Sequence, residues 1–165
     1  EGYVKDLASS YAWNISSSEF ENMDKLGETV KEIHQLQIND NIQANGDHMY
    51  FNPIMVMRVD ENPFQLEKRE YPVDFGSPEE KIFVARITLP KDWTVEELPK
   101  PKALVLPGSV AKCLYTVTQN GNVLSVTSQL VINKALFTQD EYPGLRDFYG
   151  QVVAKQAELV VLKKN

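Results

Sequence analysis

The stretch KCLYTVTQNGNVLSVTSQLVI, residues 112–132, decides the fold class. Its second half alternates apolar and polar side chains, which is the two-residue period of a half-buried strand. Its first half is rich in β-branched and aromatic residues, which also favour a strand. Between the halves lies Asn120-Gly121, and an Asn-Gly pair supplies the positive φ angles of a type I′ turn. The stretch therefore predicts a β-hairpin.

Other segments upstream of this hairpin share a strand-like pattern. They are residues 28–38, 47–51, 81–89 and 103–106. In 81–89, Ala85, Ile87 and Leu89 share the face that we expect to reach the core. The stretch from Pro90 to Pro101 is rich in proline, which disfavours a helix, and it is predicted to be a loop that carries Trp93. Short strands at even spacing, with Gly and Pro turns between them, indicate an antiparallel β-sandwich.

One amphipathic helix is predicted near the C-terminus, over residues 142–155. Pro143 suits a first helical position, and apolar residues then recur at helical spacing. Residues 157–162 follow as a last strand. Residues 6–25 could hold a second, short helix, although three consecutive serines and Gly27 weaken that pattern. The expected architecture is mainly β, with one C-terminal helix and this second helix left open.

The stretch ENPFQLEKREYPVDFGSP, residues 61–78, concentrates prolines, aromatics and charges. The residue before a proline is driven into an extended conformation, so ENPF is predicted to be a chain reversal with Phe64 as its apolar anchor. Pro72 cannot donate to a strand ladder, so the piece that follows belongs at a sheet edge or a bulge. Architecture accounts for these residue types without a substrate.

Within this stretch, the residues from Arg69 onward alternate. Tyr71, Val73 and Phe75 are predicted to share one face. Arg69 would lie on the same face, where the aliphatic part of its side chain could pack. Asp74 falls on the opposite face. Its carboxylate could accept hydrogen bonds from turn amides, or pair with Arg69 if a bulge twists the strand.

The chain is long enough for one main core, and its charge is divided unevenly. It has 165 residues and a net charge of −6, with −10 in residues 1–80 and +4 in residues 81–165. Phosphate contacts need clustered Lys and Arg, so this balance argues against nucleic-acid binding. No apolar run approaches the roughly 18 residues of a membrane span. The acidic half could face a basic neighbour, or the two halves could simply be solvated surfaces.

Catalytic chemistry finds little support in the residue inventory. A cysteine nucleophile needs a histidine and an orienting acid, and only Cys113 with His34 or His48 could supply the first two. Cys113 shares a strand face with Tyr115 and Val117, so we interpret it as a core residue. Zinc needs three or four ligands, and no glycine-rich phosphate loop is present. We therefore predict no catalytic residue, no metal site and no cofactor.

Four aromatic residues leave room for a ligand platform. Trp93, Trp13, Tyr50 and Phe51 could together bind a sugar or a peptide. The alternative, which we favour, is that Trp93 clamps the proline-rich loop onto the core.

Four segments resemble, in order, the C-terminal domain of bacterial transglutaminase-like proteins. They are GDHMYFNP (46–53), NPFQLEKREYPVDF (62–75), ITLPKDWTVEELP (87–99) and YPGLRDFYGQVVAKQAELVVLKK (142–164). In that family a β-rich domain precedes a papain-like transglutaminase domain, and a domain of unknown function follows it. The resemblance covers residues 28–165, which are expected to form the β-sandwich accessory domain. Residues 1–27 are expected to be an N-terminal segment or a linker from the preceding domain.

The resemblance implies an accessory role. The family's catalytic cysteine, histidine and aspartate belong to the central domain, so Cys113, His34 and His48 inherit no role in catalysis. The expected partner is the transglutaminase-like domain upstream in the same polypeptide, in or near the bacterial cell envelope, and the protein is expected to be periplasmic or exported. A peptide or cell-surface glycan is a further partner to consider. The candidate contact residues are Glu67, Arg69, Asp74, Trp93 and Arg146.

Two alternatives from other classes remain at this point. One is an independent carbohydrate- or peptide-binding β-sandwich that uses Trp93 and nearby aromatics. The other is a stand-alone cysteine enzyme, which requires a histidine within hydrogen-bond reach of Cys113.

Overall fold

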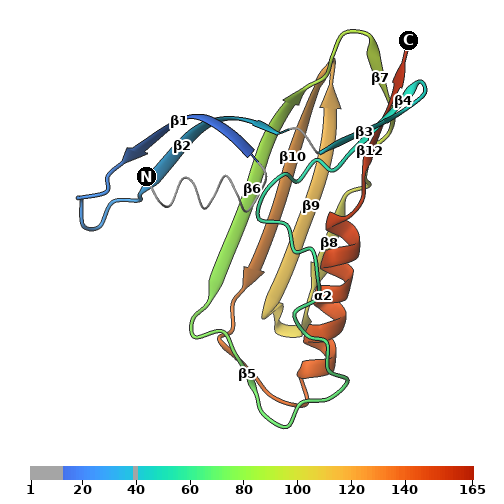
Figure 1. The fold of residues 1–165 in the computed structure, drawn as a ribbon. Coiled ribbons are helices and arrows are strands. Elements are labelled where there is room, and N and C mark those ends of the chain that lie inside the picture. Colours follow the sequence, from blue (N-terminus) through green and yellow to red (C-terminus); the bar gives the residue numbers. More distant parts are fainter. Residues whose placement is uncertain (1–12, 39–40) are drawn as a thin grey trace. The chain divides into compact units, whose positions relative to one another are not determined.

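The computed structural model of the chain describes residues 13–38 and 41–165 (Figure 1). The chain divides into two compact units, residues 1–43 and residues 44–165. No helix in the described ranges is both long enough and apolar enough to cross a membrane.

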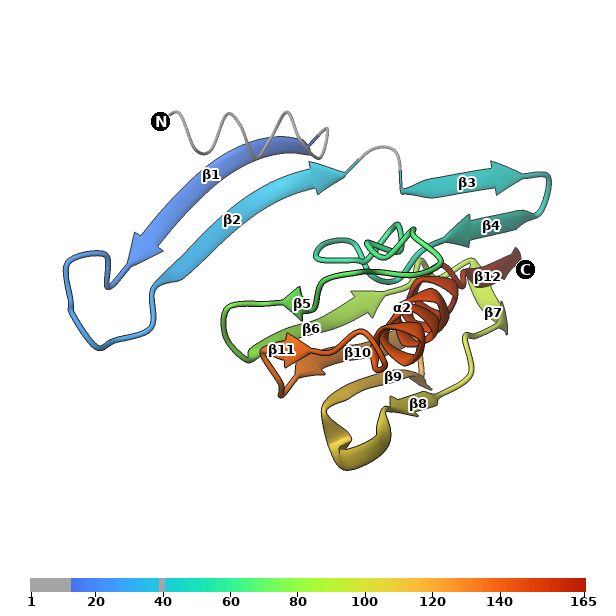
Figure 2. The same ribbon diagram turned by 90° about the horizontal axis from the view of Figure 1, so that it is seen from below.

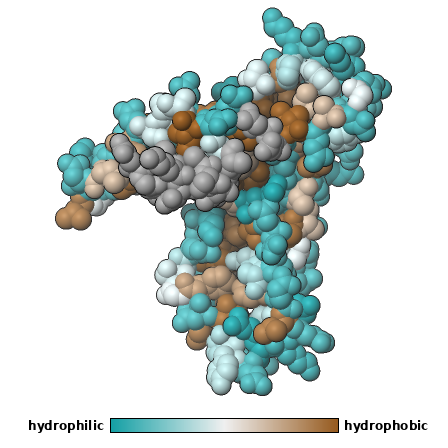
Figure 3. Space-filling model, viewed as in Figure 1, coloured by the Kyte–Doolittle hydropathy of each residue, from teal (hydrophilic) through white to brown (hydrophobic). Residues whose placement is uncertain are grey.

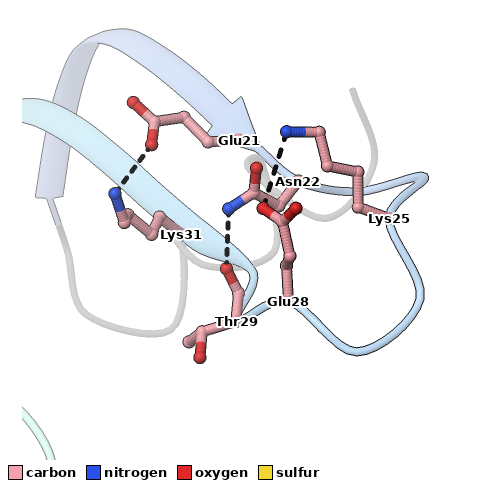
Figure 4. A network of polar contacts seen from close by, with 6 residues as sticks. All are labelled: Glu21, Asn22, Lys25, Glu28, Thr29 and Lys31. Carbon is pink, nitrogen blue, oxygen red and sulfur yellow. Dashed lines mark hydrogen bonds and ion pairs between the residues drawn. The ribbon is translucent and has the colours of Figure 1, made fainter.

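The first unit contains an antiparallel hairpin of β1 (Trp13–Glu21) and β2 (Lys31–Ile38), whose register shifts between Ile15 and Ser17. Polar contacts join the ends of the two strands and the loop between them (Figure 4). Lys31 Nζ lies 3.0 Å from Glu21 Oε2, and Asn22 donates to the backbone oxygen of Thr29 at 3.1 Å. No residue of the range 13–38 is buried.

The second helix that residues 6–25 could have held is wrong for residues 13–21, which form strand β1. Residues 6–12 lie outside the described residues. The physical reason is that Ser and Asn compete with helical backbone hydrogen bonds, while the neighbouring segment 31–38 offers β1 an antiparallel ladder that pairs all but one of its residues. The strand predicted over 28–38 is confirmed for residues 31–38, which form β2, whereas residues 28–30 belong to the loop before it.

The second unit is built on a four-stranded antiparallel sheet, here called the main sheet. Its strands in spatial order are β6 (Glu79–Thr88), β10 (Val123–Ile132), β9 (Ala111–Asn120) and β8 (Lys102–Val105). The central hairpin β9–β10 confirms the prediction from residues 112–132. Alternation along β10 buries Leu124, Val126, Leu130 and Ile132 on the inner face of the sheet.

The turn of this hairpin differs from the predicted type I′. The last paired residues are Asn120 and Val123, so the two central residues are Gly121 and Asn122. Gly121 has a φ of 59°, whereas Asn122 does not belong to the described non-glycine residues with positive φ. A positive φ confined to a glycine in the first central position is the pattern of a type II′ turn. The register of the hairpin places glycine one position earlier in the turn than a type I′ turn would.

A second antiparallel sheet has the order β3 (Ile42–Asn45), β4 (His48–Phe51), β12 (Val160–Lys164) and β7 (Trp93–Glu97). The prediction that Trp93 lies in a loop is wrong, because Trp93 begins β7 and faces Lys164 of β12. The prolines that suggested a loop lie at positions 90 and 99, outside the strand, where they disturb no ladder bond. A short 3-10 turn, η1 (Pro107–Ser109), follows β8.

One helix, α2 (Tyr142–Gln156), packs against the inner face of the main sheet (Figure 2). Its buried face carries Leu145, Phe148, Tyr149 and Val152, as the helical spacing predicted. The largest core cluster joins these residues to Cys113, Leu130 and Ile132 of the sheet. A second cluster joins Phe51, Val160 and Leu162 of the smaller sheet to Leu124.

The predicted fold class is therefore confirmed: the protein is mainly β, with antiparallel sheets packed together and one C-terminal helix. In the view of Figure 3, hydrophilic residues cover much of the described surface, and hydrophobic residues lie among them in small patches. Function must therefore be sought in particular segments of this surface.

Candidate functional site

Residues 61–78, here called the 61–78 loop, run past the N-terminal half of α2 and form the candidate site. Phe64 is buried and is the anchor that the sequence predicted. Its ring makes edge-to-face contacts with Phe75, Tyr142 and Tyr149, at centroid distances of 6.2, 5.9 and 5.0 Å. One aromatic side chain thus fixes the loop to the helix and to the loop's own far end.

The turn before this anchor is held by both ends of one amide. Asn62 Oδ1 accepts a hydrogen bond from the backbone N–H of Phe64 at 2.9 Å, which closes an Asx turn. Asn62 Nδ2 donates to the backbone oxygen of Arg146 in α2 at 2.8 Å. The chain reversal predicted at Asn62-Pro63 is therefore also a clamp on the helix.

Asn52, in a second Asn-Pro pair, makes the same two kinds of hydrogen bond at the C-terminal end of α2. Asn52 Oδ1 accepts from the backbone N–H of Ile54 at 2.8 Å, and Asn52 Nδ2 donates to the backbone oxygen of Gln156 at 2.7 Å. Carbonyls of the last helical turn lack an intrahelical partner, so this contact satisfies one of them. We name the two turns the Asn-Pro clamps. Only the turn at Asn62-Pro63 was predicted, although both turns carry the pattern Asn-Pro followed by an apolar residue.

The far end of the 61–78 loop is a short strand at an edge, as Pro72 predicted. β5 (Val73–Asp74) pairs with β11 (Leu136–Phe137) in a two-stranded ladder. Asp74 Oδ1 accepts from the backbone N–H of Gly76 at 2.8 Å, which confirms the prediction that it bonds a turn amide. Gly76 has a φ of 75°, which a glycine adopts without strain.

The predicted common face of Tyr71, Val73 and Phe75 is wrong for Tyr71. Val73 is buried and Phe75 is half-buried in the main core cluster, but the Tyr71 side chain is 75% exposed. Regular alternation requires a continuous strand, and the strand begins only at Val73. Before that point the chain follows the loop, so parity no longer decides which way a side chain points.

The candidate contact residues fall into two groups. Glu67, Arg69 and Asp74 are exposed on the 61–78 loop, and Arg146 is half-buried on α2 beside it. The Arg69 guanidinium lies 5.8 Å from the ring centroid of Tyr142, a cation–π geometry that orders this long side chain. The Tyr142 hydroxyl in turn donates to the backbone oxygen of Leu66 at 2.7 Å. These contacts fix the backbone of the 61–78 loop, whose exposed side chains carry both negative and positive charge.

Trp93 belongs to the second group, because it lies in the smaller sheet. It is half-buried and packs against the core cluster formed by Phe51, Leu89, Val160 and Leu162. This packing agrees with the interpretation that Trp93 clamps its segment onto the core. Tyr50, which the platform hypothesis also used, stacks instead on His48 at a centroid distance of 6.3 Å.

The groups considered for cysteine chemistry lie in different elements. Cys113 is 1% exposed in the main sheet, and burial raises the pKa of its thiol to about 11. His48 lies in the smaller sheet, between Asp47 Oδ1 at 2.7 Å and Glu96 Oε2 at 3.0 Å. His34 lies in the hairpin, where its Nδ1 is 2.9 Å from the Ser18 hydroxyl. Across residues 13–38 and 41–165, no group of three or more His, Cys, Asp and Glu side chains is placed to hold a metal ion.

A groove of about 500 Å³ lies beside the 61–78 loop and was not predicted. Phe75, Leu130 and Tyr149 contribute apolar walls, while Arg58, Asp60, Glu61, Glu79 and Lys81 contribute charges. Burial, with a smaller contribution from the Glu79 charge, raises the pKa of Tyr149 to about 12, so this phenol stays protonated at neutral pH. No sequence pattern predicts the groove, because its walls come from four distant segments.

Together, these features define a β-rich domain with an exposed, rigid loop and a buried thiol. Residues 47–162 match the family described as "Domain of Unknown Function with solved-structure structure (DUF3858)", and the chain belongs to this family. No curated protein matches the chain.

A solved structure shares the fold over part of the chain. It is described as the crystal structure of a "putative protease" from Parabacteroides distasonis. The similarity has a TM-score of 0.50 at 19% sequence identity, and it covers 58% of this chain and 19% of that chain. This chain thus corresponds in fold to a minor part of a much longer protein.

Proposed function

We propose that this chain is a noncatalytic accessory domain of an exported bacterial transglutaminase-like or cysteine-protease-like protein, in which it packs against and positions the catalytic domain. The observation that carries the proposal is the fold similarity to only 19% of the length of a protein described as a "putative protease". The resemblance of residues 28–165 to the domain that follows a transglutaminase-like domain supports the same role. The partner is then the catalytic domain of the same polypeptide, in the bacterial envelope.

The state of Cys113 supports a noncatalytic role. The nucleophile in cysteine catalysis is the thiolate, which active sites stabilise by an adjacent histidine or a helix N-terminus. Burial of Cys113 does the reverse, because it raises the pKa of the thiol to about 11. At pH 8, iodoacetamide is expected to label Cys113 only as fast as the domain unfolds. Rapid labelling of the folded protein would contradict this account of the thiol.

The 61–78 loop is the proposed contact surface. It combines exposed apolar side chains, Leu66 and Tyr71, with the exposed charges of Glu67 and Arg69. Aromatic residues and Arg are the types most enriched in the energetic centres of interfaces. The Asn62 clamp and the Phe64 anchor preorganise the loop, so little conformational entropy is lost when it docks.

The test is coexpression of this chain with the upstream catalytic domain, followed by pull-down and hydrogen exchange. We expect protection of backbone amides within residues 61–78 in the complex. The double variant Leu66→Ala/Tyr71→Ala is expected to weaken capture by about tenfold or more. Val105→Ala, which truncates an exposed side chain on the main sheet, is the matched control and should bind as the unaltered chain does. A folded chain that shows no binding would overturn the docking proposal.

A peptide-binding role is the second candidate, and the groove beside the loop is the observation that favours it. Its size and its mixture of aromatic, aliphatic and charged walls suit an extended segment with one apolar anchor. Screening peptide arrays with the whole chain tests this role, and Glu61→Lys, which reverses an exposed charge on the groove wall, should change any binding found. A parallel glycan array with Trp93→Ala tests the sugar-binding alternative, for which a half-buried Trp93 offers little free ring surface.

The proposed location follows from the same resemblance. Fractionation of the source cells, with an antibody against this domain, should recover it with the envelope or the exported fraction. Recovery only with cytosolic proteins would contradict this part of the proposal.

A further inference from the structure

β6 is a ten-residue strand at the outer edge of the main sheet. β6 runs from Glu79 to Thr88 and, among the strands of residues 13–38 and 41–165, it pairs with β10 alone. Its register with β10 is continuous, without a bulge, and it contains no proline. Natural proteins usually shorten, bend or cover such an edge, because its free N–H and C=O groups can pair with another strand.

The ladder identifies which residues direct their backbone groups to this edge. Along an antiparallel strand, successive residues point their N–H and C=O groups to opposite sides. Leu89 donates its N–H to the Asn122 oxygen at 2.8 Å, so residues of odd number in this segment face β10. The residues of even number therefore direct their N–H and C=O groups to the outer edge: Glu80, Ile82, Val84, Arg86 and, at the end of the strand, Thr88.

The side chains of these same residues form the outer face of β6. Ile82 is 50% exposed and Val84 is 68% exposed, between the exposed Glu80 and Arg86. Glu80 Oε1 accepts a hydrogen bond from Gln129 Nε2 at 2.5 Å, which leaves its second carboxylate oxygen available. No ion pair of Arg86 is found within the described part of the chain. The pattern along the edge is thus acidic, apolar, apolar and basic.

This pattern is complementary to itself when reversed. Two copies of β6 paired antiparallel about a twofold axis at Phe83 would place Glu80 opposite Arg86 of the other copy and Ile82 opposite Val84. Each facing pair of even-numbered residues then joins two residues whose backbone groups point outward, so each such pair can exchange two hydrogen bonds, and the odd-numbered residues form the non-hydrogen-bonded pairs between them. Moving the axis to Val84 would oppose Ile82 to Arg86 and lose both ion pairs. Placing the axis midway between two residues would set outward-pointing backbone groups opposite inward-pointing ones, and the ladder could not form.

We propose that β6 is a self-association edge, through which two copies of this chain join their main sheets into one continuous antiparallel sheet. The occupant is a second copy because, among the registers that satisfy the backbone, the one centred on Phe83 also pairs the charges of the strand with the opposite charges of its own reverse. Cross-strand ion pairs and apolar pairs each stabilise such a junction modestly. We therefore expect a dimer that forms at micromolar to millimolar concentration.

The decisive experiment is a charge exchange measured by sedimentation equilibrium on the whole chain. Arg86→Glu places two carboxylates opposite each other at both ends of the junction, and it should weaken the dimer by about tenfold or more. Glu80→Arg should do the same with two cations. The double variant Glu80→Arg/Arg86→Glu restores opposite charges and should recover the dimer.

Two further variants separate the backbone contribution and the change of net charge. Val84→Pro removes an N–H that points to the free edge and makes no bond to β10, so it should abolish dimerisation while circular dichroism still shows a folded protein. Lys91→Glu changes the net charge as Arg86→Glu does, but lies beyond the strand, and should leave the dimer unchanged. A chain that stays monomeric across the concentration range, or a double variant that does not recover the dimer, would overturn the proposal.

Discussion

The β1–β2 hairpin and the second unit both show alternating polar and apolar residues, yet they are held together differently. Phe20 of the hairpin is 38% exposed, whereas Phe64 of the second unit is 7% exposed and contacts three other rings. Isolated two-stranded hairpins are marginally stable in water, while sheets packed on a helix bury a core. An alternating strand pattern therefore does not by itself indicate how much a strand pair contributes to the free energy of unfolding.

The largest effect is expected from the aromatic anchor. Phe64→Ala leaves a cavity between the 61–78 loop and α2, and it should lower the free energy of unfolding of the second unit by about 3–5 kcal/mol. Phe20→Ala, the matched change in the hairpin, should lower the free energy of unfolding by less than about 0.5 kcal/mol. Urea unfolding followed by circular dichroism measures both changes. Equal losses would mean that the two units do not differ in the way described.

The Asn-Pro clamps are expected to contribute the next largest effect. Asn52→Ala leaves a buried carbonyl of Gln156 and a buried N–H of Ile54 without their partner, and it should cost about 1–3 kcal/mol. Asn62→Ala should cost less, because its contacts are only partly buried.

Asn62→Asp separates the two bonds of that clamp. The carboxylate can still accept from Phe64 N–H but cannot donate to Arg146, so any loss reports the bond to the helix. If Asn62→Asp and Asn62→Ala prove as stable as the unaltered chain, the clamp does not stabilise the loop.

A smaller, pH-dependent effect is expected at the start of α2. The hydrogen bond from Lys134, followed by that from the Thr138 backbone N–H, lowers the pKa of the Glu141 carboxyl. A carboxyl whose pKa is lowered by folding adds stability above its ordinary pKa and loses it as the pH falls through the lowered value. Thermal unfolding of Glu141→Gln should therefore occur slightly below that of the unaltered chain at pH 7, with a difference that shrinks in acid. A constant difference from pH 7 to pH 2 would contradict this origin.

The smallest effect is expected from removing the first unit. A chain that starts at Ala44 keeps β4, β12, β7 and the whole main sheet, so its second unit should retain the same cooperative unfolding transition within about 0.5 kcal/mol. The measurement is urea unfolding of the shortened chain. Loss of cooperative folding would show that the second unit depends on the hairpin.

The sequence predicted the fold wherever a local rule operates over a whole element. Asn120-Gly121 and the alternation in 123–132 located the central hairpin, and Pro143 with helical spacing located α2. Residues 13–21 failed because their strand depends on pairing with a distant partner rather than on their own pattern. The turn type failed because the ladder, and not the Asn-Gly pair, sets which residues are central.

The candidate site was predictable in its anchors but not in its surroundings. The roles of Phe64 and Asp74 followed from local turn chemistry, which nearby residues determine. Tyr71 and Trp93 were misplaced because the limits of strands β5 and β7 depend on their partners β11 and β12. The groove beside the loop could not be foreseen, since its walls meet only in the folded chain.

The Asn-Pro clamps have a consequence for the length of the chain between them. They are ten residues apart and grip two helix carbonyls that are also ten residues apart, in the opposite order. Ten helical residues span about 15 Å, whereas ten extended residues could reach about 33 Å. The segment is therefore about twice as long as its path requires. The surplus is taken up around Met57, whose φ is 60°, and residues 57–61 form one wall of the groove. Within the segment, Ile54 is buried and the Val59 N–H donates to Gln156 Oε1 at 2.7 Å, so residues 55–58 are the place where a short inserted peptide tag would lengthen the loop without stretching either clamp.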